Sequence, residues 1–282
     1  MPFFENRLLF LGTGTSTGVP VLGCNCRVCR SEDPHDKRSR VSVLLKTRCL
    51  PDPAEKNASP TNWNYVLIDT SIDLRAQFFR AGTPLVNQVV YTHAHVDHFF
   101  GLDELRVIQY YLQGPIHIYC SEEVHHRLEV VYAHIFDPYV QKGGGILSVE
   151  VHPAEGRFRA GAMELLTLPV FHGGQPVQGY RWGGLAYITD CSHIPDSTLE
   201  LLEGVEVLVL DALRHKSHET HFNLDQALAV VECLKPRQTW FIHMTHDLQH
   251  AETNAGLPEG VELSYDGLEI ELSSFDPSKW VL

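Results

Sequence analysis

Four residues of types that bind metal ions stand in the segment "THAHVDH", which runs from Thr92 to His98. His93 and His95 close an apolar run that is typical of a strand, and the two-residue period of a strand would put both on one face. Asp97 and His98 follow in the turn before a second apolar segment. Imidazole and carboxylate are the usual ligands of Zn²⁺ and similar divalent ions. We therefore predict a metal site here rather than a group of solvated loop histidines.

A second group of possible ligands lies in "LGTGTSTGVPVLGCNCRVC", residues 11–29. Its glycines do not fit a dinucleotide-binding turn, because Thr17 stands where the third glycine is required. A redox pair made of Cys26 and Cys29 would leave Cys24 unexplained. Three thiolates are one ligand short of a closed tetrahedral zinc site, so a fourth ligand would have to come from elsewhere in the chain. The alternative is that these are buried or reactive thiols.

The segments that carry these residues alternate between strand-like and helical patterns. Apolar runs typical of strands end in polar residues at 7–14, 41–47, 65–71, 88–95, 116–121, 205–213 and 239–246. Residues 145–189 and 261–272 are also rich in strand patterns. The periodicity predicts helices over 72–82, 98–114, 122–136 and 224–234, the last capped by Asn223. Two mixed sheets packed face to face, with helices outside, would bury all of these runs, so we expect an α/β fold of this kind.

The composition limits the class of protein. No linker or low-complexity tract divides the chain, so we expect one domain over residues 1–282, and a hydrophobic content of 44% is enough for a large core. The formal charge of −13 repels phosphates, which disfavours long nucleic acid as a partner. No apolar run is long enough to cross a membrane, and residues 1–7 lack the basic segment of an export signal. We therefore expect a cytoplasmic protein with reduced thiols.

The segment 92–98 is similar to the H-x-H-x-D-H signature of the metallo-β-lactamase superfamily. This resemblance implies an αββα four-layer sandwich with a metal cleft at one edge of its two sheets. The remaining ligands of that family would then close later strands of the chain, in order. His172, Asp190 and His243 each close an apolar run and match that order.

The resemblance implies a site for two divalent ions. The predicted ligands of the two ions, which share Asp190, are His93, His95 and His172 for one and Asp97, His98 and His243 for the other. A bridging water that has lost its proton would attack the substrate, and Asp97 would also take part in catalysis. Mn²⁺, Zn²⁺ and Fe²⁺ all suit such ligands. Asp69 would support a metal-binding histidine rather than bind metal.

Residues 210–228, "LDALRHKSHETHFNLDQAL", are similar to a segment of the PhnP-like phosphodiesterases, the phosphoribosyl cyclic phosphodiesterase branch, which is related to RNase Z. This resemblance implies that His221 donates a proton to the leaving group. The alternative is that His221 only caps the helix that begins near Asn223. Asp211 closes a strand and could orient a histidine or approach the metals.

The stretch 11–29 is similar to the same branch, in which three cysteines and one histidine bind a structural zinc ion. The resemblance assigns this zinc to Cys24, Cys26, Cys29 and His246. His246 lies three residues after His243, so one histidine would face the catalytic cleft and the other the cysteines. Residues 50–64 are an insertion that departs from the branch, which leaves the substrate open.

These features predict a metal-dependent phosphodiesterase that acts on a small phosphodiester or nucleotide, with a cyclic phosphate as the expected substrate. The first alternative is an RNase Z-like nuclease that processes the 3′ end of tRNA, although the acidic charge and the lack of a Lys-rich arm argue against it. A thioesterase or lactamase would leave Thr220 and His221 unexplained. A non-catalytic zinc protein would be expected to have lost ligands, whereas every position is filled. A homodimer is the predicted assembly.

Overall fold

The computed structural model describes residues 3–50, 61–137, 139 and 145–272, so residues 51–60 of the 50–64 insertion lie outside it. Within these residues the strands form two seven-stranded sheets. In spatial order the first sheet contains β14 (Glu269–Glu271), β1 (Phe3–Gly12), β2 (Ser42–Leu50), β3 (Asn64–Ile68), β4 (Gln88–Val90), β5 (Ile116–Cys120) and β6 (Val149–Pro153). The second sheet contains β13 (Val261–Leu263), β12 (Gln238–Ile242), β11 (Val207–Asp211), β10 (Leu185–Ile188), β9 (Gln175–Trp182), β8 (Met163–His172) and β7 (Arg157–Ala160).

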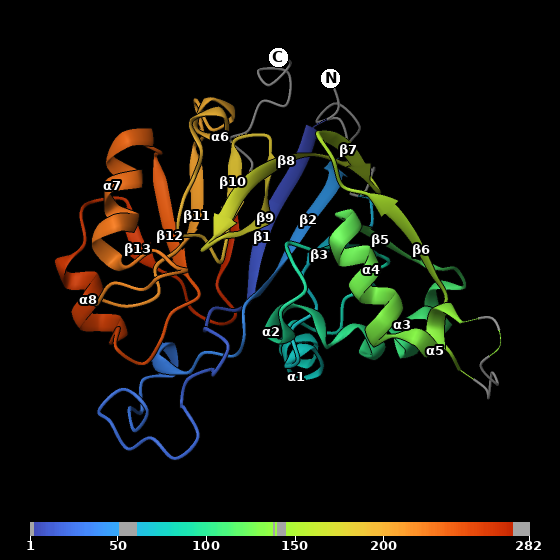
Figure 1. Cartoon of the computed structure of the whole chain (residues 1–282), viewed down its shortest axis with the longest axis horizontal. Coiled ribbons are helices and arrows are strands. Elements are labelled where there is room, and N and C mark those ends of the chain that lie inside the picture. Colours follow the sequence, from blue (N-terminus) through green and yellow to red (C-terminus); the bar gives the residue numbers. More distant parts are fainter. Residues whose placement is uncertain (1–2, 51–60, 138, 140–144, 273–282) are drawn as a thin grey trace.

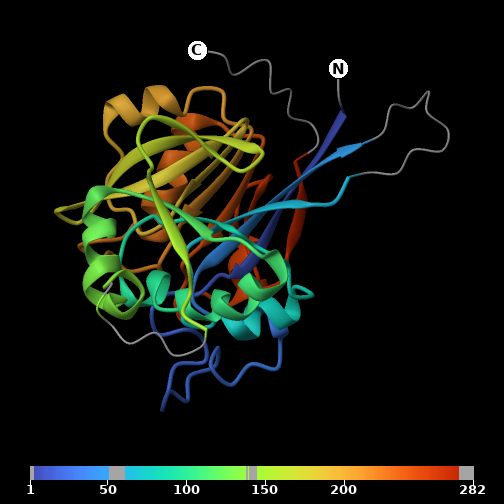
Figure 2. The same cartoon turned by 90° about the vertical axis from the view of Figure 1, so that its right-hand side faces the viewer.

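Both sheets are mixed, and in the same way. In the first sheet β14, β1, β2 and β3 pair antiparallel, and β3 to β6 pair in parallel. In the second sheet β7 to β10 pair antiparallel, and β10 to β13 pair in parallel. Figure 2 shows β14, in red, beside β1, in blue, so the last described strand joins the first. Each half of the chain therefore begins with antiparallel strands and continues with parallel ones.

Helices cover the outer face of each sheet, and Figure 1 shows the two sheets between these helical layers. The first sheet is covered by α1 (Leu74–Arg80), α2 (Val96–Phe99), the 3-10 helix η2 (Leu102–Glu104), α3 (Leu105–Leu112), α4 (Glu122–Val131) and α5 (Ala133–Phe136). The second sheet carries α6 (Asp196–Leu201), α7 (Leu224–Leu234) and α8 (His250–Gly256), and the 3-10 helix η1 (Pro34–Asp36) lies between β1 and β2. The predicted αββα sandwich is confirmed. Among the described helices, none has the length and apolar character that crossing a membrane requires.

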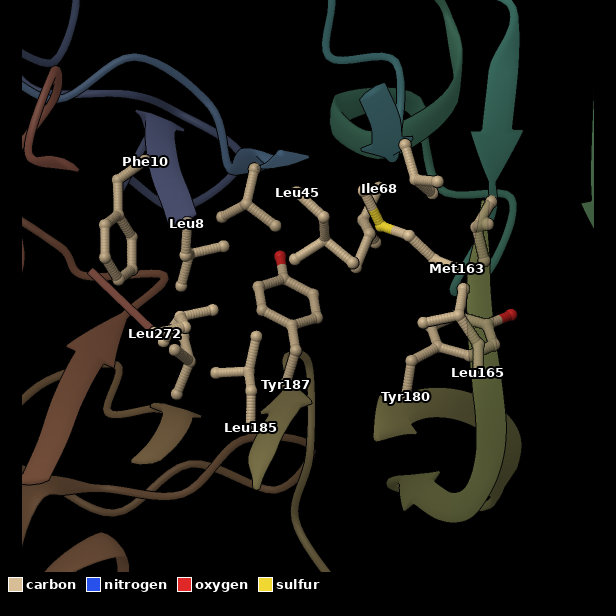
Figure 3. Close-up of a cluster of buried hydrophobic side chains, with 14 of the residues drawn as sticks. Leu8, Phe10, Leu45, Ile68, Met163, Leu165, Tyr180, Leu185, Tyr187 and Leu272 are labelled. Carbon is tan, nitrogen blue, oxygen red and sulfur yellow. The ribbon is translucent and has the colours of Figure 1, made fainter. Parts of the chain in front are cut away.

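The space between the sheets is filled by alternate side chains of their strands. In β1, Leu8 and Phe10 point between the sheets, while Leu9 and Leu11 pack under the helices. This alternation is the two-residue period of a strand that lies between two apolar layers. Figure 3 shows residues of the two sheets facing one another: Leu8, Phe10, Leu45 and Ile68 from the first and Leu165, Tyr180, Leu185 and Tyr187 from the second. The packing fixes the sheets relative to each other and so determines where their strand ends meet.

The helix predicted over 98–114 is instead three short pieces, α2, η2 and α3. Gly101 lies at the first break, and a Cβ atom there would lie 2.0 Å from the carbonyl oxygen of Ser71. This close approach to the loop after β3 overrides the helical periodicity. The helix predicted over 122–136 is divided too, at Tyr132, between α4 and α5.

The prediction that His93 and His95 lie in a strand is wrong, because β4 ends at Val90. The backbone N–H of Thr92 donates to the side chain of Asp69 at 2.8 Å instead of to a neighbouring strand. The two imidazole rings still lie side by side, with centroids 4.5 Å apart. Their proximity therefore comes from the loop between β4 and α2 and not from strand alternation.

Replacing Gly101 with Ala should destabilise the fold, because the added methyl group must displace the Ser71 carbonyl. Overpacking of this kind costs about 1–3 kcal/mol, so the free energy of unfolding should fall by at least that order. Urea unfolding followed by circular dichroism measures the difference. Gly256→Ala is the matched control, because a Cβ there meets no atom within 4 Å and stability should be unchanged or slightly higher. An equal loss in both variants would contradict the packing argument.

Candidate active site

Polar side chains that close strands of both sheets meet at one edge of the sandwich. In the first sheet Asp69 follows β3, and the segment 93–98 follows β4. In the second sheet the corresponding residues are His172 at the end of β8, Asp190 after β10, Asp211 at the end of β11 and His243 after β12. The carboxyl ends of neighbouring parallel strands lie at the same edge of a sheet. Each sheet therefore delivers its own part of the group to one place.

The carboxylate of Asp190 is the centre of this group, and only 2% of the residue is exposed. Its Oδ1 lies 3.2 Å from Nε2 of His98 and 3.2 Å from Nε2 of His243, and its Oδ2 lies 3.6 Å from Nε2 of His93. Asp97 approaches from α2, with Oδ2 3.5 Å from Nε2 of His98 and 3.4 Å from Nε2 of His243. Two buried carboxylates thus share a set of imidazole nitrogens.

The remaining predicted ligands lie beside His93. The ring centroids of His93 and His95 are 4.5 Å apart, and those of His95 and His172 are 5.1 Å apart. His95 is exposed whereas His172 is buried, so the group opens to solvent beside His95. Two sets of possible ligand atoms that share Asp190 each lie within 4.8 Å: Asp97, His98, Asp190 and His243 in one, and His93, His95 and Asp190 in the other. All seven residues predicted as ligands are therefore brought together.

These residues fit divalent cations. The Nε2 atoms of His93 and His98 are buried and have no hydrogen-bond partner within the described part of the chain. Nitrogen–oxygen separations of 3.2 Å for His98 and 3.6 Å for His93, both to Asp190, resemble the edges, about 3.4 Å, of a tetrahedron with bonds of about 2.1 Å. The donor set of imidazole nitrogen and carboxylate oxygen is the one that Zn²⁺ and similar ions take.

The charges of the group favour the same ligands. Burial raises the pKa of Asp190, but His243 and His98 outweigh it and hold this pKa well below its usual range. Burial likewise opposes ionisation of Asp97, and His98 and His243 again hold its pKa well below the usual range. Burial lowers the pKa of His93 well below its usual value. Metal binding requires ionised carboxylates and neutral imidazoles, and these three groups are already in that state. Burial opposes ionisation of His98 and His243, but Asp190 and Asp97 outweigh it and raise both pKa values, so these two imidazoles would lose a proton when a cation binds.

Asp69 lies behind the histidines and fixes their orientation. Nδ1 of His98 donates to Oδ2 of Asp69 at 2.7 Å, so Nε2 is turned toward Asp190. The hydroxyl of Thr92 also donates to Asp69, at 2.8 Å, and lies 3.0 Å from Nδ1 of His93. Such outer partners set the tautomer and the angle of a metal-binding imidazole. The contacts of Thr92 with Asp69 and His93 were not predicted from the sequence.

Three residues of the group have left-handed backbone. The φ angles are 63° at Asp69, 54° at Asp190 and 60° at His243. Each residue directly follows a strand or lies two positions beyond its end, so the left-handed turn ends the strand at the site. For a residue with a Cβ this conformation costs on the order of 1–3 kcal/mol and persists only where surrounding contacts enforce it. No sequence pattern used above detects this feature.

His221 contacts both sides of the group. Its ring stacks on His243 with centroids 4.8 Å apart and an interplanar angle of 15°, and its centroid lies 4.5 Å from that of His172. Nδ1 of His221 lies 3.1 Å from Oδ2 of Asp211, which is fully buried. The alternative role as a helix cap is wrong, because the cap of α7 is Asn223, whose side chain accepts a hydrogen bond from the backbone of Gln226 at 2.9 Å.

Burial disfavours charge on both members of the Asp211–His221 pair. It raises the pKa of Asp211 well above its usual range and lowers the pKa of His221 to about 4. A neutral carboxyl beside a neutral imidazole holds as many protons as a carboxylate beside an imidazolium. The pair as a unit therefore carries one proton that it can give to a neighbouring group.

The cysteines of the N-terminal loop lie around His246. Its Nδ1 is 3.3 Å from Sγ of Cys24, 3.5 Å from Sγ of Cys26 and 3.3 Å from Sγ of Cys29. A zinc tetrahedron with bonds of about 2.3 Å to sulfur and about 2.0 Å to nitrogen has sulfur–nitrogen edges of about 3.5 Å. The N–H of Cys29 donates to Sγ of Cys26 and holds the pKa of that thiol at about 7. The four residues therefore fit a structural zinc ion.

A buried arginine ties the cysteine loop to the strand that carries His243. Arg38 is 1% exposed, and its guanidinium donates to the carbonyls of Thr245 at 2.7 Å and Leu248 at 2.6 Å, on either side of His246. The backbone of Met244 donates to Thr13 at 3.0 Å in the same region. Arg38 could not be predicted from the sequence, because an arginine between two loops has no pattern that distinguishes it from a surface residue.

Comparisons with known proteins identify the family. A sequence profile described as "Beta-lactamase superfamily domain" matches residues 64–244, which is more than half of the chain. The chain belongs to this superfamily. The matched part contains the predicted ligands from His93 to His243 but not the cysteine loop.

Two solved structures show which members of the superfamily this chain is similar to. A solved structure described as a new diphosphatase from the PhnP family is 39% identical, covers 96% of this chain and 98% of its own, and has a TM-score of 0.83. This similarity supports the predicted PhnP-like branch. Human tRNase Z, short form, shares the fold, with 17% identity, 94% and 98% of the two chains covered and a TM-score of 0.61.

An octanoyltransferase from Porphyromonas gingivalis is 34% identical over 281 residues, which are 96% of this chain but 54% of the relative. The chain thus spans about half the length of this curated relative. The activity in its name belongs to a protein with a further part that this chain does not match.

Replacing Asp69 with Asn should weaken metal binding, because the amide cannot accept the hydrogen bond from His98 in the same way. Loss of such an outer partner typically lowers metal affinity about 10–100-fold. Metal content measured by mass spectrometry at a series of free Zn²⁺ concentrations detects the change, and zinc at the cysteine site serves as an internal reference. Asp103→Asn, at an exposed carboxylate of η2, is the control and should leave metal affinity unchanged. Equal zinc affinities for Asp69→Asn and the control would contradict the role of Asp69 in supporting His98.

Replacing Cys26 with Ser should remove about one zinc ion per chain and lower the melting temperature, because structural zinc contributes its binding free energy to folding. Cys233→Ser is the matched control, since Cys233 is an exposed free thiol on α7. Zinc counting and thermal unfolding on both variants make the comparison. An unchanged zinc count in Cys26→Ser would reject the structural zinc.

Proposed function

We propose that this superfamily hydrolase is a metal-dependent phosphodiesterase that cleaves a small, cyclic phosphodiester, with His221 as the proton donor to the leaving group. The observation that carries the proposal is the Asp211–His221 pair, held at 3.1 Å against the predicted metal ligands. A ring nitrogen of His221 lies within 4.8 Å of possible ligand atoms of His172 and Asp190. The donor is therefore adjacent to the reacting centre.

The chain would hold two divalent ions on the residues that share Asp190, and Zn²⁺, Mn²⁺ and Fe²⁺ all suit them. When bound, such ions lower the pKa of a water and offset charge on the phosphoryl oxygens. Asp190 and Asp97 supply the negative charge that keeps two cations close together. Asp69 keeps the ring of His98 aimed at them. Because the exposed side lies at His95, the substrate would enter from there.

His221 would act on the side of the leaving group. Its ring is held by Asp211 at Nδ1 and by the rings of His172 and His243, so it has little freedom to rotate. As the phosphorus–oxygen bond breaks, the departing oxygen would take the proton of the Asp211–His221 pair. Hydrolysis of the phosphodiester consumes one water molecule, and a proton from this water replaces the one given to the leaving group, so the pair is restored in each cycle.

The site and the relatives support two classes of phosphorylated substrate. The 39% identical PhnP-family protein is named a diphosphatase, which makes a diphosphate the second candidate, because it offers the same phosphoryl centre. Acyl transfer, the activity named for the longer relative, is not proposed, because the thiol nearest the group is unsuited to carry an acyl chain. This thiol, Cys191, lies next to Asp190 but is fully buried, and burial raises its pKa above the ordinary value. The acidic charge of −13 disfavours tRNA as the substrate.

The metal-loaded protein should be assayed against five substrates: a cyclic ribose phosphate, bis(p-nitrophenyl) phosphate, a dinucleoside diphosphate, a thioester and a precursor tRNA. We expect turnover of the cyclic phosphate and of the nitrophenyl diester. Turnover of the diphosphate alone would support the second candidate. Turnover of the thioester or the tRNA alone would overturn the proposal.

His221→Ala should lower turnover of a diester with an alkoxide leaving group by about 10²–10⁴-fold, because an alkoxide needs a proton as it departs. A nitrophenolate is a weak base that leaves without one, so the loss with bis(p-nitrophenyl) phosphate should be much smaller. Metal content should stay near the wild-type value. His218→Ala is the control, since His218 is an exposed neighbour with a ring centroid 5.2 Å from that of His221.

Two outcomes would contradict the role of His221. Equal losses on both leaving groups would point to positioning of the substrate rather than proton donation. Loss of metal from His221→Ala would identify His221 as a ligand.

A further inference from the structure

A third group of possible metal ligands lies away from both sites described above, on the parallel strands β5 and β6. Its members are His117 on β5 and Glu150 and His152 on β6. In the register of the two strands His117 pairs with Glu150, and Tyr119 pairs with His152. Because side chains alternate along a strand, all three point to the face opposite the buried Ile116 and Ile118.

The three side chains converge on one point. Nδ1 of His117 lies 3.1 Å from Nε2 of His152 and 3.4 Å from Oε2 of Glu150. One possible ligand atom from each residue lies within 4.8 Å of the other two. The ligands of one ion, bonded at about 2.0–2.2 Å, are separated by about 2.9 Å at right angles and about 3.4 Å in a tetrahedron. The two distances from Nδ1 of His117, 3.1 Å and 3.4 Å, fall in this interval.

A hydrogen bond alone does not account for this arrangement. Nδ1 of His117 faces two atoms that can accept a proton, Nε2 of His152 and Oε2 of Glu150, but it carries at most one proton. The single proton on Nδ1 of His117 can therefore point at only one of these two atoms. A cation placed among the three atoms would take one lone pair from each of them.

The strands hold the ligands in place before any ion arrives. The ring of His152 stacks on Tyr119, with centroids 4.9 Å apart and an interplanar angle of 26°. The hydroxyl of Tyr119 in turn donates to the side chain of Gln88 at 2.9 Å. A site on paired strands keeps its geometry better than one on a loop. Side-chain exposures of 27% for His117 and 57% for Glu150 give an ion a path from solvent.

We propose that His117, Glu150 and His152 form a third site for a divalent transition-metal ion, with Zn²⁺ as the reference ion. Two imidazoles and one carboxylate leave the remaining coordination positions to water, so the site is open rather than closed. Since β6 is an edge strand, seen at the right of Figure 1, a bound ion would fasten this edge to β5. The site uses none of the residues assigned to the active site or to the cysteine loop.

The test uses the full chain with its other metal sites filled. Protein is equilibrated with buffers of increasing free Zn²⁺, and bound zinc per chain is measured by mass spectrometry. We expect the wild type to take up one more ion than His152→Ala over the same range, with the variant weaker by at least about 10-fold at this step. Glu150→Gln, which keeps the shape and removes the charge, should also bind more weakly. His126→Ala is the matched control, since His126 is an exposed histidine near a glutamate, 3.9 Å from Glu129.

An extra ion that persists unchanged in His152→Ala and His117→Ala would overturn the proposal, as would a wild-type protein that takes up no more zinc than these variants. A second measurement tests the site in the wild-type protein, without any substitution. Anomalous diffraction from a zinc-soaked wild-type crystal should show a peak between His117, Glu150 and His152. Absence of that peak at full occupancy of the cysteine site would reject the third site.

Discussion

An ionised carboxylate taken out of water is the constraint on which the active site depends. Asp190 is almost completely buried, and isolation of such a charge would be very unfavourable. Three imidazoles stabilise the carboxylate of Asp190, with Nε2 atoms 3.2–3.6 Å from its oxygens. These separations are also those expected between ligands of one cation. Asp69 orients the ring of His98, and left-handed backbone occurs at Asp69, Asp190 and His243, where strands end. These features all surround one buried charge.

The cysteine loop and the active site share a short piece of backbone. His243 and His246 are three residues apart, and Arg38 holds the carbonyls on either side of His246. Met244, which lies between His243 and His246, forms backbone hydrogen bonds with Thr13 and Thr15. The loop that carries the cysteines therefore also supports the end of β12. A zinc ion bound by this loop would add order to a small segment without regular secondary structure. Loss of order in the cysteine loop should therefore also disturb the position of His243.

Much of this group could be predicted from the sequence. The spacing in the segment from His93 to His98 indicated a metal site, and the resemblance to the metallo-β-lactamase superfamily then singled out the polar residues that close later strands. Thr92, Arg38 and the break at Gly101 could not be predicted, since each depends on a contact with residues far away in the chain. His93 and His95 lie in the predicted group, but strand alternation does not place them there, because β4 ends at Val90 and Asp69 holds the loop through the backbone of Thr92.

The predicted metal ligands come from both sheets, and those of the first sheet are synthesised first. Residues up to β6 supply the segment 93–98, whereas His172, Asp190 and His243 all come from the second sheet. A nascent chain that has emerged only through β6 holds several histidines but lacks the carboxylate that the ions would share. The group of predicted ligands is therefore complete only after the second half of the chain has been synthesised and has packed against the first.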